Sequence, residues 1–170
     1  MLRFLTVFLT FALSASFSSA DFKLGAVDMQ RALQSVEMGK KAKAALEKEF
    51  NEKKKQLQSE EESIKKLTED FKKQSMVLSE DAKRKKEGEI QERMMKYREF
   101  FSKSQFDIQN RERELTEPII VKLRAVVEET GKTKGFTLIV EKGSEAILYS
   151  SSGEDVTEEV IKAFNKKHNG

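Results

Sequence analysis

The chain has 170 residues, of which 36% are charged, and its formal net charge is only +3. It contains no cysteine and a single histidine, which excludes disulfide staples, thiol chemistry and a zinc site of the cysteine–histidine type. Charges of both signs are interleaved along most of the chain, a pattern that favours long solvated helices over a deep catalytic pocket.

Residues 1–20 have the pattern of a secretory signal peptide. Arg3 supplies a positive start, residues 4–13 form an apolar run, and small residues stand before Asp21. The run is too short to span a membrane, which takes about twenty apolar residues. We therefore expect cleavage after Ala20 and export of the mature chain, with a retained N-terminal anchor as the alternative.

The start of the mature chain predicts one strand and one short helix. Val27 and Met29 lie among small residues in the segment 22–29, which indicates a strand. Residues 30–36 are expected to form a short helix. Gly39 is expected to loosen the chain before the next element.

Residues 39–115 predict two long helices folded back on each other, because the segment has no proline and only two glycines. Apolar residues recur at heptad spacing in both halves, as in an antiparallel coiled coil. The expected seam consists of Leu46, Phe50, Leu57, Ile64, Leu67 and Phe71, then Ile90, Met94, Tyr97, Phe101, Ile108 and Leu115. Polar residues such as Lys53, Ser104 and Arg111 interrupt it, which indicates a weakly packed arm.

The turn between these helices is expected at residues 75–79. Ser79 is a good N-cap, and Glu80 and Asp81 place negative charge where it meets the positive end of the helix dipole. Pro118, the only proline, is expected to kink the second helix where the arm returns to a body.

The residues after the proline predict the rest of that body. A wide apolar helical face comprises Ile119, Ile120, Leu123, Val126 and Val127, and the helix is expected to end between Gly131 and Gly135. Two β-prone runs, 136–140 and 146–149, are expected to pair as a hairpin. A last helix from Thr157 is expected to bury Val160, Ile161 and Phe164.

We therefore expect one body made of residues 21–38 and 116–170, with the arm, residues 39–115, inserted between them. Three short strands form a thin core that is marginal on its own. We expect several copies to combine their strands in one shared sheet. The candidate oligomerisation residues are Val27, Met29, Phe136, Leu138, Val140, Ile147 and Tyr149.

The two ends of the mature chain resemble the Skp/OmpH family of periplasmic chaperones. The similarity lies in Lys23-Leu24-Gly25-Ala26-Val27-Asp28-Met29, in 136–140 with 146–151, and in the terminal segment 155–164. It implies an α+β fold in which a long antiparallel helical hairpin, a coiled-coil arm, is inserted into a small β-rich trimerisation body. It also implies a jellyfish-like homotrimer in the periplasm that holds unfolded outer-membrane β-barrel proteins between its arms without ATP.

Three apolar residues of the descending arm, Met95, Phe100 and Phe106, lie off the expected seam. We expect them to offer adaptable apolar contacts to an unfolded chain, as flexible methionine-rich surfaces do. A broader seam that buries them is the alternative.

The expected arm tip, from Lys65 to Lys86, carries eight basic and four acidic residues and therefore a local net charge of +4. The candidate client-binding residues here are Lys72, Lys73, Lys83, Arg84, Lys85 and Lys86. Such a cluster attracts acidic clients or anionic lipid, including lipopolysaccharide. Ordinary solubility of a charged helix end is the alternative.

No catalytic, cofactor-binding or metal-binding constellation is found in the sequence, so we expect a protein that is not an enzyme. His168 lies two residues from the end of the chain, and Gly131-Lys132-Thr133-Lys134-Gly135 is too short and misordered for a phosphate loop. The competing function is an exported coiled-coil spacer that binds lipopolysaccharide or other envelope components. Export argues against a nucleic-acid partner.

Overall fold

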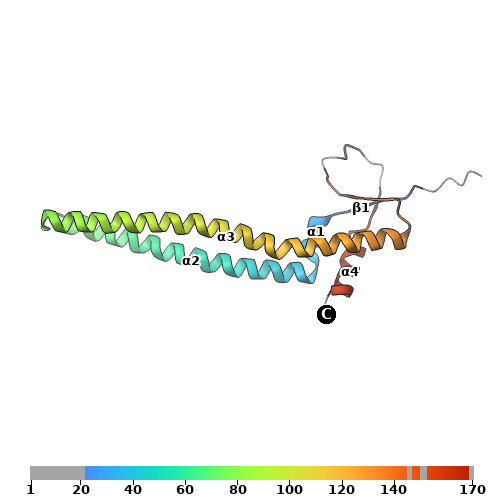
Figure 1. The fold of residues 1–170 in the computed structure, drawn as a ribbon, viewed down its shortest axis with the longest axis horizontal. Coiled ribbons are helices and arrows are strands. Elements are labelled where there is room, and N and C mark those ends of the chain that lie inside the picture. Colours follow the sequence, from blue (N-terminus) through green and yellow to red (C-terminus); the bar gives the residue numbers. More distant parts are fainter. Residues whose placement is uncertain (1–21, 145–146, 150–152, 169–170) are drawn as a thin grey trace, which may run out of the picture.

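The computed structural model describes residues 22–144, 147–149 and 153–168, so the expected signal peptide, 1–20, lies outside the described residues. Two long helices, α2 (Glu37–Gln74) and α3 (Glu80–Lys134), lie side by side and form an arm (Figure 1). The other elements gather at one end of it. They are β1 (Leu24–Val27), α1 (Met29–Ser35), β2 (Leu138–Glu141), β3 (Glu154–Asp155) and α4 (Thr157–His168).

The arm confirms the predicted helical hairpin. At about 1.5 Å per residue, the 38 residues of α2 span about 57 Å, and the 55 residues of α3 continue past α2 into the body. The turn falls where it is expected, and the Ser79 hydroxyl caps α3 by accepting a hydrogen bond from the Ala82 amide at 3.3 Å.

The facing sides of the two helices match the predicted seam in part: Ile90 is buried, and Leu57, Ile64, Tyr97 and Ile108 are half-buried. Polar pairs cross the arm between Glu49 and Arg111, Lys53 and Asp107, and Ser63 and Arg93. Arg111 was expected on the seam, but Arg93 and Asp107 were not, and because their pairs place them toward α2 the contact line on α3 is rotated away from Met94 and Phe101. Those two side chains are exposed, whereas Phe100, expected off the seam, is half-buried.

Gly39 does not loosen the chain, contrary to the sequence prediction. It lies buried in the first turns of α2, which begins at Glu37, directly after Val36. Its role is close packing against α1 rather than flexibility.

Pro118 does not interrupt α3, which is helical from Glu80 to Lys134. The ribbon of α3 bends gently between its yellow and orange parts (Figure 1). Pro118 lies inside this helix and removes one backbone donor from it. The helix ends as predicted, because Gly135 adopts the left-handed conformation with φ 71° and caps it.

The sheet has three strands in the order β2-β1-β3, and both pairs are parallel. The strands predicted at 22–29 and 136–140 are present, but the predicted hairpin is wrong. Residues 147–149 form no strand, because two successive turns, closed by the bonds from Ser144 N to Glu141 O and from Ile147 N to Ser144 O, lead the chain away from β2. The third strand of the sheet is instead β3, which pairs with β1 on the side away from β2, through Glu154 and Asp155.

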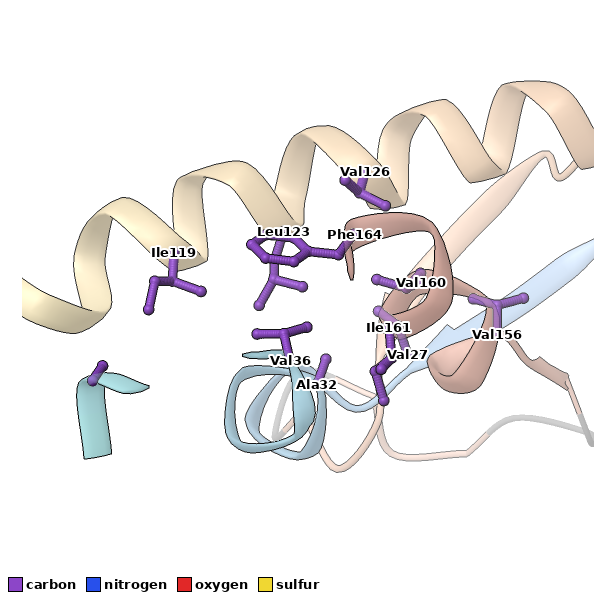
Figure 2. Packing of buried hydrophobic residues seen from close by; sticks show 11 residues of the cluster. Val27, Ala32, Val36, Ile119, Leu123, Val126, Val156, Val160, Ile161 and Phe164 are labelled. Carbon is purple, nitrogen blue, oxygen red and sulfur yellow. The ribbon is translucent and has the colours of Figure 1, made fainter. Parts of the chain in front are cut away.

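The hydrophobic core lies where α1, α3 and α4 meet, beside β1 (Figure 2). Leu123 of α3 and Phe164 of α4 are fully buried and face Val36, at the end of α1. The predicted apolar faces of α3 and α4 are confirmed. The buried cluster consists of Val27, Ala32, Val36, Ala42, Ile119, Leu123, Val126, Val156, Val160, Ile161 and Phe164.

Candidate functional site

The described residues contain no group of three or more carboxylate, histidine or cysteine side chains that is able to hold a metal ion. Among the helices of residues 22–144 and 153–168, none is long and apolar enough to cross a membrane. The candidate sites are therefore surfaces, and they fall into four regions: the back of the arm, its two side grooves, its tip and the sheet end of the body.

Two of the three apolar candidates lie on the back of the arm. Met95 and Phe106 are eleven residues apart, which is close to three helical turns, so they share one face of α3. That face is turned away from α2, and the two side chains are 59% and 63% exposed. This agrees with the prediction that the seam does not use them.

The third candidate, Phe100, lies elsewhere. It is half-buried and lines a narrow groove of about 350 Å³ together with Tyr97 and Lys96 of α3 and with Gln56 and Glu60 of α2. The structure therefore separates Phe100 from Met95 and Phe106 and places it at the edge of the helix–helix contact.

A larger groove of about 570 Å³ runs along the opposite side of that contact, and we call it the arm groove. Its apolar lining consists of Phe50, Leu57, Tyr97, Phe101 and Ile108, and its polar lining of Lys53, Lys54, Gln58, Glu61, Ser104, Gln105 and Gln109. The sequence prediction missed it, since Phe50 and Phe101 were assigned to the seam. Because Phe100 and Phe101 are adjacent and both apolar, the spacing alone did not show which of them faces α2.

Ser104 stands out in this groove. It is only 4% exposed, and its hydroxyl is the one buried side-chain oxygen or nitrogen of the described residues that makes no hydrogen bond. A buried hydroxyl without a partner costs free energy, so this position favours a ligand that supplies the missing bond.

Ion pairs hold the two arm helices together, one of them at the arm groove itself and one nearer the body. Lys53 Nζ lies 2.9 Å from Asp107 Oδ2, and Arg111 Nε lies 2.9 Å from Glu49 Oε1. The hydrogen bond that Arg111 donates to Glu49 raises the pKa of Arg111 above its ordinary value, and the one that it donates to Glu114 contributes next. These pairs fix the register of the two helices without sealing the space between them.

At the tip, the structure divides the basic candidates into two groups. Lys83 pairs with Glu80 at 2.7 Å and Arg84 pairs with Asp81 at 2.6 Å, both within the first turn of α3. Within the described chain, the other four candidates make no ion pair: they are Lys72, Lys73, Lys85 and Lys86. The turn between the helices adds two almost fully exposed apolar side chains, Met76 and Val77, which the sequence analysis did not single out.

The oligomerisation candidates are distributed between the core and the surface of the body. Val27 is buried by its own chain, Met29 and Val140 are half-buried, and the Phe136 ring covers Gly25. The other three, Leu138, Ile147 and Tyr149, are exposed. In the described residues, the outer edge of β2 pairs with no strand.

A hydrogen-bonded junction joins β3 to α4 beneath this sheet. Asp155 Oδ1 accepts a hydrogen bond from the Thr157 amide at 2.9 Å, and its other oxygen lies 3.2 Å from Lys142 Nζ. The hydrogen bonds from the Thr157 side chain and amide lower the pKa of Asp155 to about 2. The fully buried Thr157 hydroxyl in turn accepts a bond from the Asp28 amide at 2.9 Å.

Comparisons with known proteins identify relatives of this arrangement. A family model described as outer membrane protein (OmpH-like) matches residues 23–164. A crystal structure of a candidate outer membrane chaperone (OmpH-like) from Caulobacter crescentus superposes with a TM-score of 0.74 at 14% identity, covering 86% of this chain and 85% of that one. At that identity the superposition shows a shared fold. A comparison with curated proteins gave no match.

Proposed function

Because the chain belongs to the OmpH-like outer membrane protein family, whose members are periplasmic, non-enzymatic chaperones, we propose that it is an ATP-independent holdase for unfolded outer-membrane β-barrel proteins. The main observation in support of this proposal is that large apolar side chains are exposed along a highly charged arm. Met95 and Phe106 on the back of α3, and Phe50 and Phe101 at the arm groove, are exposed although each is large enough to be core.

The mechanism we propose is the sum of many weak contacts. An exposed apolar side chain gains about 1–2 kcal/mol when a client covers it, and an exposed ion pair gains about 1 kcal/mol or less. Spread over an arm of this length, such contacts hold a long unfolded chain without requiring any particular sequence. Release needs no nucleotide, because a client that folds into its membrane buries the apolar surface that the arm was holding.

We further propose that residues 21–38 and 116–170 act as an oligomerisation body and that residues 39–115 act as the arm of each subunit. The open edge of β2 and the exposed side chains of Leu138, Ile147 and Tyr149 support association through the sheet end of the body. A trimer would enclose a client between three arms. Native mass spectrometry of the secreted protein, with and without a denatured outer-membrane protein, measures the subunit number and the client stoichiometry together. A stable monomer that takes no client would contradict this assembly.

The holdase activity is tested by light scattering. An outer-membrane β-barrel protein unfolded in urea is diluted into buffer with and without a molar excess of the mature chain. We expect the excess to suppress scattering, and equal scattering in both samples would refute the proposal. An exported coiled-coil spacer, the competing function, would leave scattering unchanged and would bind little of a dye that reports exposed apolar surface.

A further inference from the structure

The polar lining of the arm groove includes three glutamines. Gln58 of α2 and Gln105 and Gln109 of α3 line it, and none of the three amides has a hydrogen-bond partner within the described chain. A side-chain amide offers both a donor and an acceptor, in the same geometry as a peptide group.

The floor of the groove is apolar and the buried hydroxyl of Ser104 lies there. Phe50 and Phe101 flank it and are 52% and 44% exposed, so their rings have room to turn. A chain that enters between them meets apolar surface and, beneath it, a hydroxyl that water does not reach. A volume of about 570 Å³ falls within the range of about 300–1,000 Å³ that pockets for small ligands have.

We infer that the arm groove is a subsite for an extended polypeptide segment, which deepens the proposed function and rests on it. One apolar side chain of the segment lies between Phe50 and Phe101, over Leu57 and Ile108. The peptide groups on either side exchange hydrogen bonds with the glutamine amides. Once the side chains that cover Ser104 move aside, one peptide carbonyl accepts the hydrogen bond of its hydroxyl. Because every client has peptide groups, the subsite tolerates many sequences.

The rim chemistry favours a polypeptide over a lipid acyl chain. An acyl chain has no group along its length that is able to bond with the glutamine amides or with Ser104, so it would leave the buried Ser104 hydroxyl without a partner and gain nothing from the exposed amides. The charged residues at the rim do not select one sign either, because Lys54 and Glu61 both lie there and Lys53 is already paired with Asp107.

The test uses the full mature chain and a fluorescein-labelled unstructured peptide in which phenylalanine alternates with serine. We expect the double variant Phe50→Ala/Phe101→Ala to lose at least about fivefold in peptide affinity, as truncation of a central aromatic contact does. The matched control is Met95→Ala/Phe106→Ala, which removes two exposed apolar side chains from the back of α3. It is expected to change the affinity less than the groove variant.

Ser104→Ala separates binding from folding. The substitution removes an unpartnered buried hydroxyl and introduces a better helix former, so the protein is expected to resist urea better than the wild type. The peptide affinity is nevertheless expected to fall about two- to tenfold, the equivalent of one hydrogen bond. A more stable variant with unchanged peptide affinity would overturn the role of Ser104 in the subsite.

The remaining outcomes also decide the inference. If wild-type protein suppresses aggregation but the back-face variant loses more peptide affinity than the groove variant, the subsite is refuted and the holdase proposal stands. If palmitate displaces the peptide, the groove is an acyl-chain site. If the groove variant changes the subunit number, the groove is a contact between copies. A wild type that fails to suppress aggregation refutes the holdase proposal itself.

Discussion

A side chain on Gly39 would collide with Leu33, because a Cβ placed at Gly39 would lie 1.7 Å from the Leu33 carbonyl oxygen. Gly39 belongs to α2 and Leu33 to α1, so the backbones of the two helices are in direct contact at this point. This contact sets the angle at which the arm leaves the body, next to the buried side chain of Val36.

Gly39→Ala is therefore expected to destabilise the protein by about 2–3 kcal/mol, since the backbone of one helix must move. The control is Gly88→Ala. Gly88 also lies inside a long helix, but nothing stands within 4 Å of its added Cβ, so this variant is expected to gain about 0.5–1 kcal/mol from helix propensity. Urea unfolding followed by circular dichroism measures both. Equal effects of the two substitutions would contradict the close-approach role of Gly39.

Asp155→Ala is expected to lower the free energy of unfolding by about 1 kcal/mol at neutral pH, because the Thr157 amide loses its acceptor. The pKa of Asp155 is lowered from 3.8 to about 2 in the folded chain, so the ionised carboxylate contributes stability that is fully present above pH 3.8. This contribution is lost as the pH falls from 3.8 to about 2.

The measurement is urea unfolding of wild type and Asp155→Ala at stepwise lower pH. The difference between the two proteins is expected to shrink across that interval. Asp70→Ala serves as the control, because Asp70 makes no ion pair or hydrogen bond within the described chain. A difference that stays constant down to the lowest pH would show that Asp155 does not act through its charge.

The ion pair between Lys53 and Asp107 is expected to couple the two arm helices by about 0.5–1 kcal/mol. A double-mutant cycle with alanine at both positions measures this energy, and added salt is expected to reduce it. The matched cycle is Asp81 with Arg84, a more exposed pair within one helix, for which about 0.3–0.5 kcal/mol is expected. A larger coupling in the second cycle would argue against a role for Lys53 in holding the arm together.

The tip is expected to attract acidic clients mainly through lysines that have no acidic partner. Lys85→Gln/Lys86→Gln should weaken client capture several-fold at low ionic strength, and the effect should disappear near 1 M salt, where screening acts over about 3 Å. Lys83→Gln/Arg84→Gln should have less effect, because those two side chains are already paired with Glu80 and Asp81.

A control for net charge is Lys41→Gln/Lys48→Gln, which makes the same charge change near the body end of α2. Client affinity is measured by fluorescence anisotropy over a salt series. If all three double variants behave alike, the tip contributes general solubility rather than directed capture.

The local features of the fold were predictable from the sequence. The N-cap at Ser79, the left-handed glycine at position 135 and the apolar faces that bury Leu123 and Phe164 each depend on a few neighbouring residues. Short-range patterns therefore predicted the long helices, the turn and most of the core.

Pairing over long distances was not predictable in the same way. The run 136–140 was assigned to a hairpin with its neighbour in sequence, whereas the strand found there, β2, pairs in parallel with β1, where Leu24 aligns with Leu138. β-propensity indicates that a segment forms a strand, but it does not indicate which other strand it pairs with. The arm groove was missed for a related reason: with Phe100 and Phe101 adjacent, apolar spacing alone left the rotation of α3 undetermined, and polar pairs such as Lys53 with Asp107 decided it.

Because α3 runs unbroken through Pro118, one rigid helix joins the core of the body to the arm tip. From Ile119 to Glu80 the helix reaches about 60 Å at 1.5 Å per residue. A tilt of about one degree at Ile119 therefore displaces its start at Glu80 by about 1 Å. Modest repacking around Leu123 is thereby amplified into a larger displacement of the arm tip. The side chains that set this displacement are aliphatic residues of the buried core, far from the tip.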